Sequence, residues 1–420
     1  MTENQSQTAE AKTGTKAGAK VRKRYTRVSY LRWGIMGAFL LFMLFVSYQH
    51  NAIGGGLTGY PTVDALCPFG GVESLYKIII AGELLQRVAF SSVVLAVSVI
   101  FLALVSRRSF CGWICPLGAI QEWLGVLGRK IMGRLLQIPA SIDRYLRWLK
   151  YILLVVILYF TWRLADLVFR PYDPWATLMH LWEGPGVLEK FSYGLAVLGL
   201  LAAGSFFLDR FWCKYACPLG ALLAICSWPG QILLRRDPEI CIKCGMCNRV
   251  CPMNIKVLEQ EKITDWECIN CLDCQNNCPK PGALSLDRLS ARAGAKPVSL
   301  TTLVVVVLGI FFGMYGLARA ADLWQSTNSG ATITNILHQE TGEPSDPNQL
   351  PIVEEIKGYM TIEQVAAMYR LTTPELYQLL NLPADIPATT KLKELSSYPQ
   401  AGGLDEELIR TIIQEKVVDK

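Results

Sequence analysis

The sequence predicts an α-helical polytopic membrane protein of about five spans, with an inserted α+β domain rich in cysteine and a small C-terminal all-α domain. Three observations support this fold class. The chain of 420 residues is 51% hydrophobic with a mean hydropathy of +0.29, which is high for a soluble protein. Eight cysteines fall in two tight runs between residues 241 and 278. Residues 331–420 carry seven Lys/Arg against fourteen Asp/Glu, so this end of the chain is acidic.

Five apolar segments are predicted to span the membrane, because each approaches the ~20 helical residues that cross a ~30 Å hydrocarbon core. They cover residues 31–48, 86–105, 149–168, 191–208 and 298–318. No small-residue cleavage site follows the first apolar run, so it is predicted to be an uncleaved span rather than a signal peptide. Residues 1–30 are predicted to form a disordered basic tail.

Basic residues orient the predicted spans. Lys and Arg outnumber Asp and Glu by eight to two in residues 1–32, by eight to two in residues 106–150, and by twelve to nine in residues 209–297. Because cytoplasmic loops carry the excess of Lys and Arg, these three regions are predicted to lie on the cytoplasmic side of the inner membrane. An odd number of spans then places the C-terminal domain outside.

The spans divide the chain into further predicted parts. A four-span membrane domain covers residues 31–235, the cysteine-rich domain 236–290, the fifth span 298–318, and an acidic helical domain 350–420. In the last part, Thr361 followed by Gln364 predicts a capping box. Thr373 followed by Pro374 predicts an N-cap with proline at the first helical position. An acidic domain is a poor binder of duplexes, so no nucleic-acid partner is expected.

Two cysteine runs of identical spacing predict iron–sulfur ligands. The pattern C-x-x-C-x-x-C-x-x-x-C-P begins at Cys241 and recurs 27 residues later at Cys268. In this two-cluster ferredoxin signature, three close thiolates bind one cubane and the fourth cysteine crosses to the other cluster. The predicted ligands are Cys241, Cys244, Cys247 and Cys278 for one [4Fe–4S] cluster, and Cys268, Cys271, Cys274 and Cys251 for the second. A pair of zinc sites is the alternative, but zinc rarely uses eight cysteines in this swapped pattern.

A second repeat lies at the predicted cytoplasmic boundary. The motif Phe110-Cys111-Gly-Trp-Ile-Cys115-Pro-Leu-Gly-Ala recurs 102 residues later as Trp212-Cys213-Lys-Tyr-Ala-Cys217-Pro-Leu-Gly-Ala. Each copy follows a predicted span that runs inward, so the two halves would be related by an axis along the membrane normal. Three interpretations of Cys111, Cys115, Cys213 and Cys217 remain open: a shared metal or third cluster, redox-active thiols, or structural bracing of helix ends.

Two cysteines lie outside these repeats. Cys67, in LCPFGGVE, looks like half of the C-x-x-x-C-P motif but follows a span that runs outward, so it is expected on the other face. It is predicted to be structural, with a metal ligand or a contact for an outside partner as the alternative. Cys226 fits no spacing and is predicted to pack as a small apolar residue. No C-x-x-C-H motif occurs, so covalent haem is not expected.

Together these motifs resemble the membrane polyferredoxins of the NosR and NapH type, which are accessory proteins of nitrous-oxide reductase and periplasmic nitrate reductase. That family carries paired C-x-x-x-C-P motifs followed by a two-cluster ferredoxin. The resemblance covers roughly residues 85–290, and CGWICPLGA and DRFWCKYACPLGA are especially similar to the NosR type. The chain departs from that type because residues 1–30 leave no room for the periplasmic flavin domain, so the flavin-linked step is not carried over.

The resemblance implies a membrane electron-transfer protein, a component of an oxidoreductase system rather than a stand-alone enzyme. Single electrons are expected to pass through two [4Fe–4S] clusters between the cytoplasmic side or the quinone pool and a partner redox protein, in anaerobic respiration. The expected partners are a reductase, a cytochrome or a quinone-linked subunit. Two alternatives stay open: a metal-centre maturation or copper-reducing assembly factor, and a redox-sensing membrane regulator.

Overall fold

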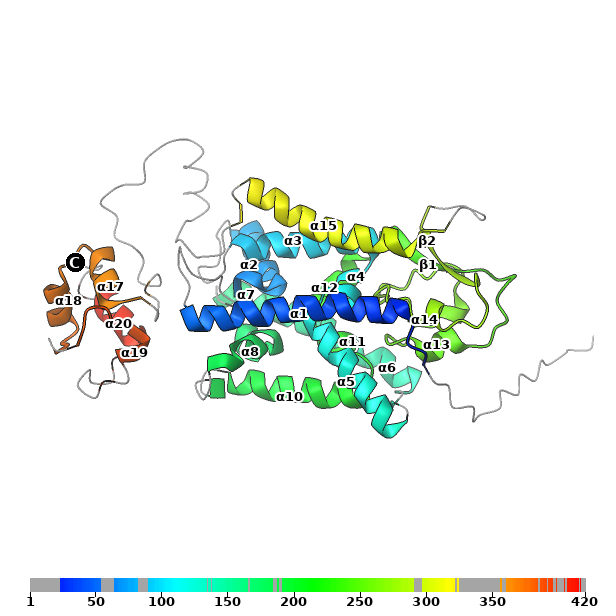
Figure 1. Ribbon diagram of the computed structural model, residues 1–420, viewed down its shortest axis with the longest axis horizontal. Coiled ribbons are helices and arrows are strands. Elements are labelled where there is room, and N and C mark those ends of the chain that lie inside the picture. Colours follow the sequence, from blue (N-terminus) through cyan, green and yellow to red (C-terminus); the bar gives the residue numbers. More distant parts are fainter. Residues whose placement is uncertain are drawn as a thin grey trace, which may run out of the picture.

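The computed structural model describes most of the chain (Figure 1). The described residues are 23–53, 64–81, 90–133, 135–136, 138–164, 167–183, 187–188, 191–290, 297–321, 323–324, 356, 360–383, 386–390, 392–395, 398, 404, 406–414 and 416. All fourteen cysteines are among them, and no disulfide joins any two. Most of the predicted basic tail, residues 1–22, lies outside the described residues.

Three described helices are long and apolar enough to cross a membrane. They are α1 (Arg27–Ile53), the helical segment Ser141–Leu164, and α15 (Leu300–Ala320). The second of these contains α6 (Ala140–Leu146) and α7 (Leu149–Leu164). Two further apolar helices, α3 (Phe90–Ser106) and α10 (Ser192–Phe207), are shorter. All five predicted segments are therefore helical over most of their length, and three of the described helices meet the length expected of a span.

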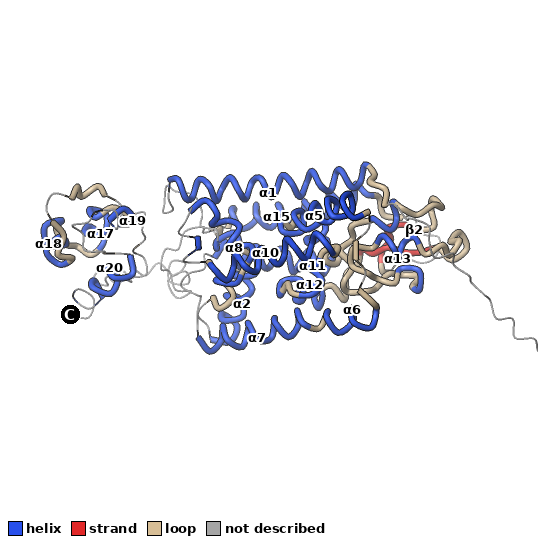
Figure 2. The backbone as a smooth tube through the Cα atoms, turned by 90° about the horizontal axis from the view of Figure 1, so that it is seen from below, coloured by secondary structure: helices blue, strands red, loops and turns tan. Residues whose placement is uncertain are grey.

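These helices run side by side along the long axis of the molecule (Figures 1 and 2). Helix α15 packs on α3, and α3 packs on α2 (Pro68–Ala81). Helix α1 packs on α5 (Pro116–Met132), and α5 packs on α10. Helix α7 lies against α2 and α12 (Pro218–Cys226), and α8 (Pro174–His180) lies beside α1 and α10. The result is a bundle with a cysteine-rich domain at one end.

The 102-residue repeat is present in the backbone as well as in the sequence. Helix α4 (Ser109–Trp113) ends before Cys115, which is the N-cap of α5; helix α11 (Phe211–Tyr215) ends before Cys217, the N-cap of α12. The proline after each cysteine stands at the start of the new helix, where its missing N–H costs no hydrogen bond. In both copies the N–H of the second cysteine donates to the carbonyl before the first cysteine, at 2.9 Å. Both motifs therefore fold as a short helix, a break at cysteine, and a second helix.

The cysteine-rich domain contains a two-stranded antiparallel sheet. Strand β1 (Ile232–Arg236) pairs with β2 (Leu284–Arg288), and the cysteine runs lie between them with the short helices α13 (Met246–Val250) and α14 (Asp273–Asn276). The 27-residue repeat is visible in the backbone, since left-handed residues occupy the same two places in each run. These residues are Lys243 and Gly245 in the first run, and Asn270 and Leu272 in the second.

The segment before α1 reaches the cysteine-rich domain. Lys23 makes an ion pair with Asp273 at 2.7 Å, and the Arg24 N–H donates to the side-chain oxygen of Asn277 at 2.6 Å. The Asn277 amide in turn donates to the carbonyl of Arg24 at 3.2 Å. The start of the first apolar helix and the cysteine-rich domain therefore lie at the same end of the bundle.

The C-terminal part has its own apolar core. Helices α17 (Ile362–Met368), α18 (Thr373–Leu379), α19 (Leu392–Leu395) and α20 (Glu406–Ile413) bury Val365, Leu376, Leu395 and Ile409 together. The predicted capping box of Thr361 and Gln364 is confirmed. The prediction that Thr373 caps the next helix is wrong: the N-cap is Thr372, whose N–H and hydroxyl both donate to Glu375 at 2.7 Å. The reciprocal contact with Glu375, three residues on, fixes the cap one residue earlier than proline alone suggests.

Replacing Thr361 or Thr372 with alanine is expected to destabilise the start of its helix by about 1 kcal/mol, because the capping contacts are lost. Thr373→Ala, at the first helical residue, is the matched control and should cost much less. Hydrogen exchange of the α17 and α18 amides in the full chain measures both effects. Equal losses at Thr372 and Thr373 would contradict the assigned cap.

Candidate metal centres

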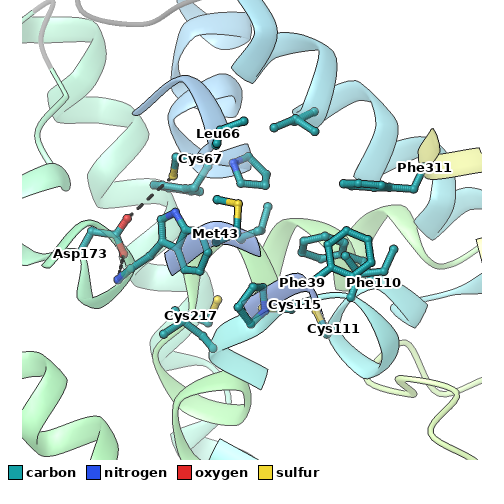
Figure 3. Close-up of a pocket in the computed structure, with 18 of the residues that line it drawn as sticks. Phe39, Met43, Leu66, Cys67, Phe110, Cys111, Cys115, Asp173, Cys217 and Phe311 are labelled. Atoms are coloured by element: carbon teal, nitrogen blue, oxygen red, sulfur yellow. Dashed lines mark hydrogen bonds between the residues drawn. The ribbon is translucent and has the colours of Figure 1, made fainter. Parts of the chain in front are cut away.

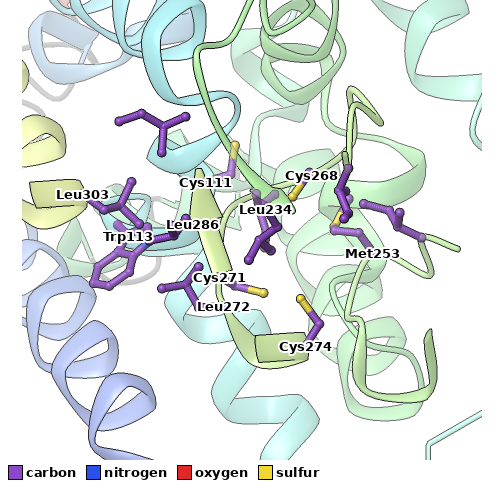
Figure 4. Close-up of a cluster of buried hydrophobic side chains, with 14 of the residues drawn as sticks. Cys111, Trp113, Leu234, Met253, Cys268, Cys271, Leu272, Cys274, Leu286 and Leu303 are labelled. Atoms are coloured by element: carbon purple, nitrogen blue, oxygen red, sulfur yellow. The ribbon is translucent and has the colours of Figure 1, made fainter. Parts of the chain in front are cut away.

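The structure groups the eight cysteines of the two runs as the spacing predicts. Cys241, Cys244, Cys247 and Cys278 line one small pocket of the cysteine-rich domain. The other four gather separately: burial raises the pKa of Cys274, and the charges of Cys271, Cys251 and Cys268 raise it further. In Figure 4 the sulfur atoms of Cys271 and Cys274 point toward each other. The members of each predicted set, including the crossed fourth cysteine, therefore lie near one another, and their role as cluster ligands stays a prediction.

The two sets differ in their exposure. Cys244 of the first set is exposed, whereas Cys268, Cys271 and Cys274 of the second set are buried in one apolar core with Cys111 (Figure 4). Burial raises the pKa of Cys268 and of Cys271 to about 12. Binding iron at these sites would therefore displace protons from the thiols. The first set therefore reaches the surface at Cys244, although Cys247 lies in the same core, and the second set faces the helix bundle.

The second set touches the paired-cysteine motifs directly. Ile269 and Asn270 lie between Cys268 and Cys271, and both contact α4. A Cβ on Gly112 would come within 2.2 Å of the Ile269 carbonyl, so only glycine allows this approach. The Trp113 indole N–H donates to the Asn270 carbonyl at 3.0 Å. The loop of the second set and the first paired-cysteine motif therefore pack backbone to backbone.

The structure brings Cys111, Cys115, Cys213 and Cys217, here called the cysteine quartet, together from the two halves. Burial raises the pKa of Cys115, and the charges of Cys111 and Cys213 raise it further. Burial likewise raises the pKa of Cys217, with Cys213, Cys111 and Cys115 adding to the effect. Gln121 holds the second motif, donating to Cys213 Sγ at 3.2 Å and accepting from the Cys213 N–H at 3.3 Å. Two buried cysteines, Cys111 and Cys213, and two half-buried ones, Cys115 and Cys217, thus converge where the two motifs meet.

Two arginines cross between the halves beside the quartet. Arg108 and Arg210 each stand three residues before the first cysteine of a motif, and both are fully buried. Arg108 Nη2 donates to the Cys213 carbonyl at 3.3 Å, and Arg210 Nη1 donates to the Cys111 carbonyl at 2.7 Å. Each guanidinium therefore binds the main chain of the opposite motif.

The glycine of each C-P-L-G-A motif makes room for this crossing. A Cβ on Gly118 would lie 2.5 Å from Arg210 Nη1, and a Cβ on Gly220 would lie 2.7 Å from Arg108 Nη2. Real Cβ atoms essentially never approach so closely, so a side chain here would displace the arginine. The glycines and arginines are thus matched across the repeat.

Two buried carboxylates each pair with one of these arginines and with a second basic side chain. Glu122 pairs with Arg210 at 2.5 Å and also with Arg32. Glu267 pairs with Arg108 and, at 2.5 Å, with Lys150. Burial alone would raise the pKa of Glu267, but the two cations outweigh it and hold that pKa at about 2. The ion pairs join α1, α5, α7 and the cysteine-rich domain around the quartet.

A large apolar cavity of about 650 Å³ adjoins the quartet (Figure 3). All four cysteines line it, and among the described residues that line it Asp173 is the only charged one. In Figure 3, Cys111, Cys115 and Cys217 lie along the lower edge, and Cys67 lies with Asp173 on the left. Cys67 Sγ is 3.9 Å from Asp173 Oδ2. Cys67 therefore lines the same cavity as the quartet, although the sequence placed it on the other face.

Within the described residues, no three side chains among His, Cys, Asp and Glu are spaced to bind a single metal ion. This holds for both cysteine runs and for the quartet. Thiolate sulfur is a soft donor that binds both zinc ions and iron–sulfur clusters, so the chemistry of the donor sets suits either kind of centre.

Sequence reasoning missed the groups around the cysteines. It passed over Arg108 and Arg210, the acids Glu122 and Glu267, and Asp173. The arginines had a signal, because both stand at the same place in the 102-residue repeat. The acids had none, since Glu122 corresponds to Ala224 in the other copy and both Asp173 and Glu267 lie outside the two copies.

Two family profiles match the chain at these sites. A 4Fe-4S binding domain matches residues 88–134 and again residues 193–239, which contain the two paired-cysteine motifs. A 4Fe-4S dicluster domain matches residues 233–279, which contain all eight cysteines of the two runs. No solved structure matches the chain.

Curated relatives cover the same region. The chain is 31% identical over 296 residues to the putative electron transport protein YccM of Escherichia coli, across 68% of this chain and 82% of the relative. It is 30% identical over 228 residues to the ferredoxin-type protein NapH of E. coli, across 52% and 74%. The chain belongs to the membrane-bound polyferredoxins of the NosR/NapH type. The polyferredoxin also shares 34% identity over 182 residues with the regulatory protein NosR of Pseudomonas aeruginosa, across 41% of this chain but 24% of NosR.

In the polyferredoxin, Gly118→Ala and Gly220→Ala are each expected to destabilise the fold by about 1–3 kcal/mol, because the added methyl group collides with a buried arginine. Gly309→Ala is the matched control, since a Cβ there meets nothing within 4 Å. Thermal unfolding and iron content of the purified protein measure the effect. If all three variants behaved alike, the glycines would not be making room for the arginines.

Proposed function

We propose that this polyferredoxin passes single electrons between the membrane quinone pool and a partner redox protein. In the proposal, Cys241, Cys244, Cys247 and Cys278 hold a first [4Fe–4S] cluster, and Cys268, Cys271, Cys274 and Cys251 hold a second. The quartet holds a third centre. The clusters supply one-electron transfer when bound. The observation that carries the proposal is that the three cysteine groups follow one another in space: the first set reaches the surface at Cys244, the second is buried against α4, and the quartet lines the cavity.

The apolar lining of the cavity favours a lipid-soluble substrate. Its lining is apolar apart from Asp173, and it adjoins the quartet. Phe42 of α1 and Phe312 of α15 line it and are also exposed, at 56% and 53% of their surface. The cavity thus reaches the outside of the bundle between α1 and α15, where a membrane protein faces lipid. Apolar pockets of this size with few polar groups are typical of small-molecule sites.

The exchange with a quinone balances as follows. A quinol that becomes a quinone gives up two electrons and two protons. Centres held by the quartet and by the two cysteine sets would supply one-electron acceptors for those electrons, with the partner protein as the final acceptor and bulk water as the acceptor of the protons. Run in reverse, the same path reduces a quinone. The membrane arrangement in this proposal has the tail and the cysteine-rich domain in the cytoplasm and the C-terminal helical domain outside, as the basic loops favour.

The first test is the iron and acid-labile sulfide content of protein purified without oxygen in detergent. About twelve irons per chain are expected, falling to about eight when the quartet is replaced by serine, because one cubane is lost. Cys226→Ser is the control and should keep all of its iron. About eight irons in the unaltered protein would remove the third centre from the proposal, and zinc in place of iron would end it.

The second test fills the cavity. Ala38→Phe is expected to slow reduction by a short-chain quinol more than tenfold, because Ala38 lines the cavity and phenylalanine occupies it. Reduction by dithionite, which reaches the clusters directly, should be unchanged. Val305→Phe, on the exposed face of α15, is the control. Unchanged quinol reduction in Ala38→Phe would place the electron donor or acceptor elsewhere.

A further inference from the structure

We propose that Arg108 and Arg210 are the built-in counter-charges of the quartet centre, and that together they raise its reduction potential. This inference rests on the proposed third centre and assigns its charge environment to two named side chains.

The placement of the two arginines is symmetric about the quartet. Each reaches across to bind the carbonyl of the first cysteine in the opposite motif, at 3.3 Å for Arg108 and 2.7 Å for Arg210. The two guanidinium groups therefore lie on the main chain that carries Cys111 and Cys213. One such hydrogen bond would be enough to hold the two halves together, whereas two guanidinium groups add more positive charge beside the quartet than one.

The buried charges do not cancel without an anion. Arg108 and Lys150 share the single carboxylate of Glu267, which leaves one positive charge. Arg210, Arg32 and Lys23 share the carboxylates of Glu122 and Asp273, which leaves another. Uncompensated buried charge is costly. A cubane with four thiolates is net negative, so one held by the quartet would offset the charge beside Glu267. Lys23 and Arg32 also stand beside Cys271 of the second set, so a cluster there would share in offsetting the other charge.

Each arginine also has a buried N–H group that is not used in a hydrogen bond to the protein. Within the described residues, the Nε atoms of Arg108 and Arg210 are buried and have no hydrogen-bond partner. Nearly all buried polar groups in proteins are paired, so an orphaned buried donor calls for a missing acceptor. Sulfur atoms of a cluster in the quartet would be acceptors of the right charge, and hydrogen bonds to such sulfurs raise the reduction potential.

The sign of the effect follows from charge. Reduction adds one negative charge to the centre, so nearby positive charges stabilise the reduced state more than the oxidised state. Burial strengthens this because the local dielectric is low. Removing one positive charge should therefore lower the midpoint potential of the centre. Replacing arginine by lysine keeps the charge and should leave the midpoint potential nearly unchanged.

The test measures the midpoint potential of the third centre by EPR during a redox titration of the full chain in detergent, with iron counted in the same sample. The variants are Arg108→Gln, Arg210→Gln, Arg108→Lys and Arg210→Lys. Each glutamine variant leaves its carboxylate one cation, Lys150 for Glu267 and Arg32 for Glu122, which favours folding. Arg235→Gln is the control, since Arg235 pairs with Glu261 and Asp287 in the sheet region.

We expect each glutamine variant to lower the ratio of reduced to oxidised third centres about tenfold at a fixed potential. This corresponds to a midpoint potential that is ~59 mV lower for a one-electron centre. The lysine variants and Arg235→Gln should shift little. Loss of the third centre in the glutamine variants but not the lysine variants would also support the assignment, because charge alone separates them. Loss in both, or an unchanged potential with full iron, would overturn it while leaving the third centre standing. About eight irons in the unaltered protein would overturn both proposals.

Discussion

Two buried carboxylates, Glu122 and Glu267, hold the architecture together. Each accepts two cations that come from different parts of the chain, so that α1, α5, α7, both cysteine motifs and the cysteine-rich domain meet at a few oxygen atoms. Removing one partner of such a group leaves a buried charge, which typically costs 3–5 kcal/mol. Contacts between apolar helices do little to fix how far one helix is shifted along another. The ion pairs fix these relative positions, because the charged groups meet only when the helices are correctly aligned.

Close backbone packing complements the ion pairs. The approach of Ile269 to Gly112, and the passage of the arginines beside Gly118 and Gly220, need glycine at three positions. These contacts bring thiol groups of the cysteine-rich domain and of the bundle into one buried core. A soluble domain docked through a flexible surface would not reach this arrangement. The docking here is continuous with the core of the bundle.

The sequence predicted the elements that depend on local spacing. The C-x-x-C-x-x-C-x-x-x-C-P runs specify which cysteines can gather, and the five apolar segments specify helices, because both patterns act over a few turns. The partners of the quartet could not be found in this way. Glu267 lies 117 residues from Lys150, and its carboxylate looks like an ordinary exposed acid in the sequence. The contact of Cys67 with the cavity was not predicted, because the rule of alternating span direction gives a face of the membrane and not a depth in the bundle. Its segment returns far enough into the bundle to reach the quartet's cavity.

The contact between Arg24 and Asn277 has a consequence for biogenesis. The two residues lie 253 positions apart, so the ribosome completes the first helix long before the partner of its leading end exists. The contact can form only after the intervening helices and both cysteine runs have been synthesised. The leading end of the chain is therefore among the last parts to reach its native contacts.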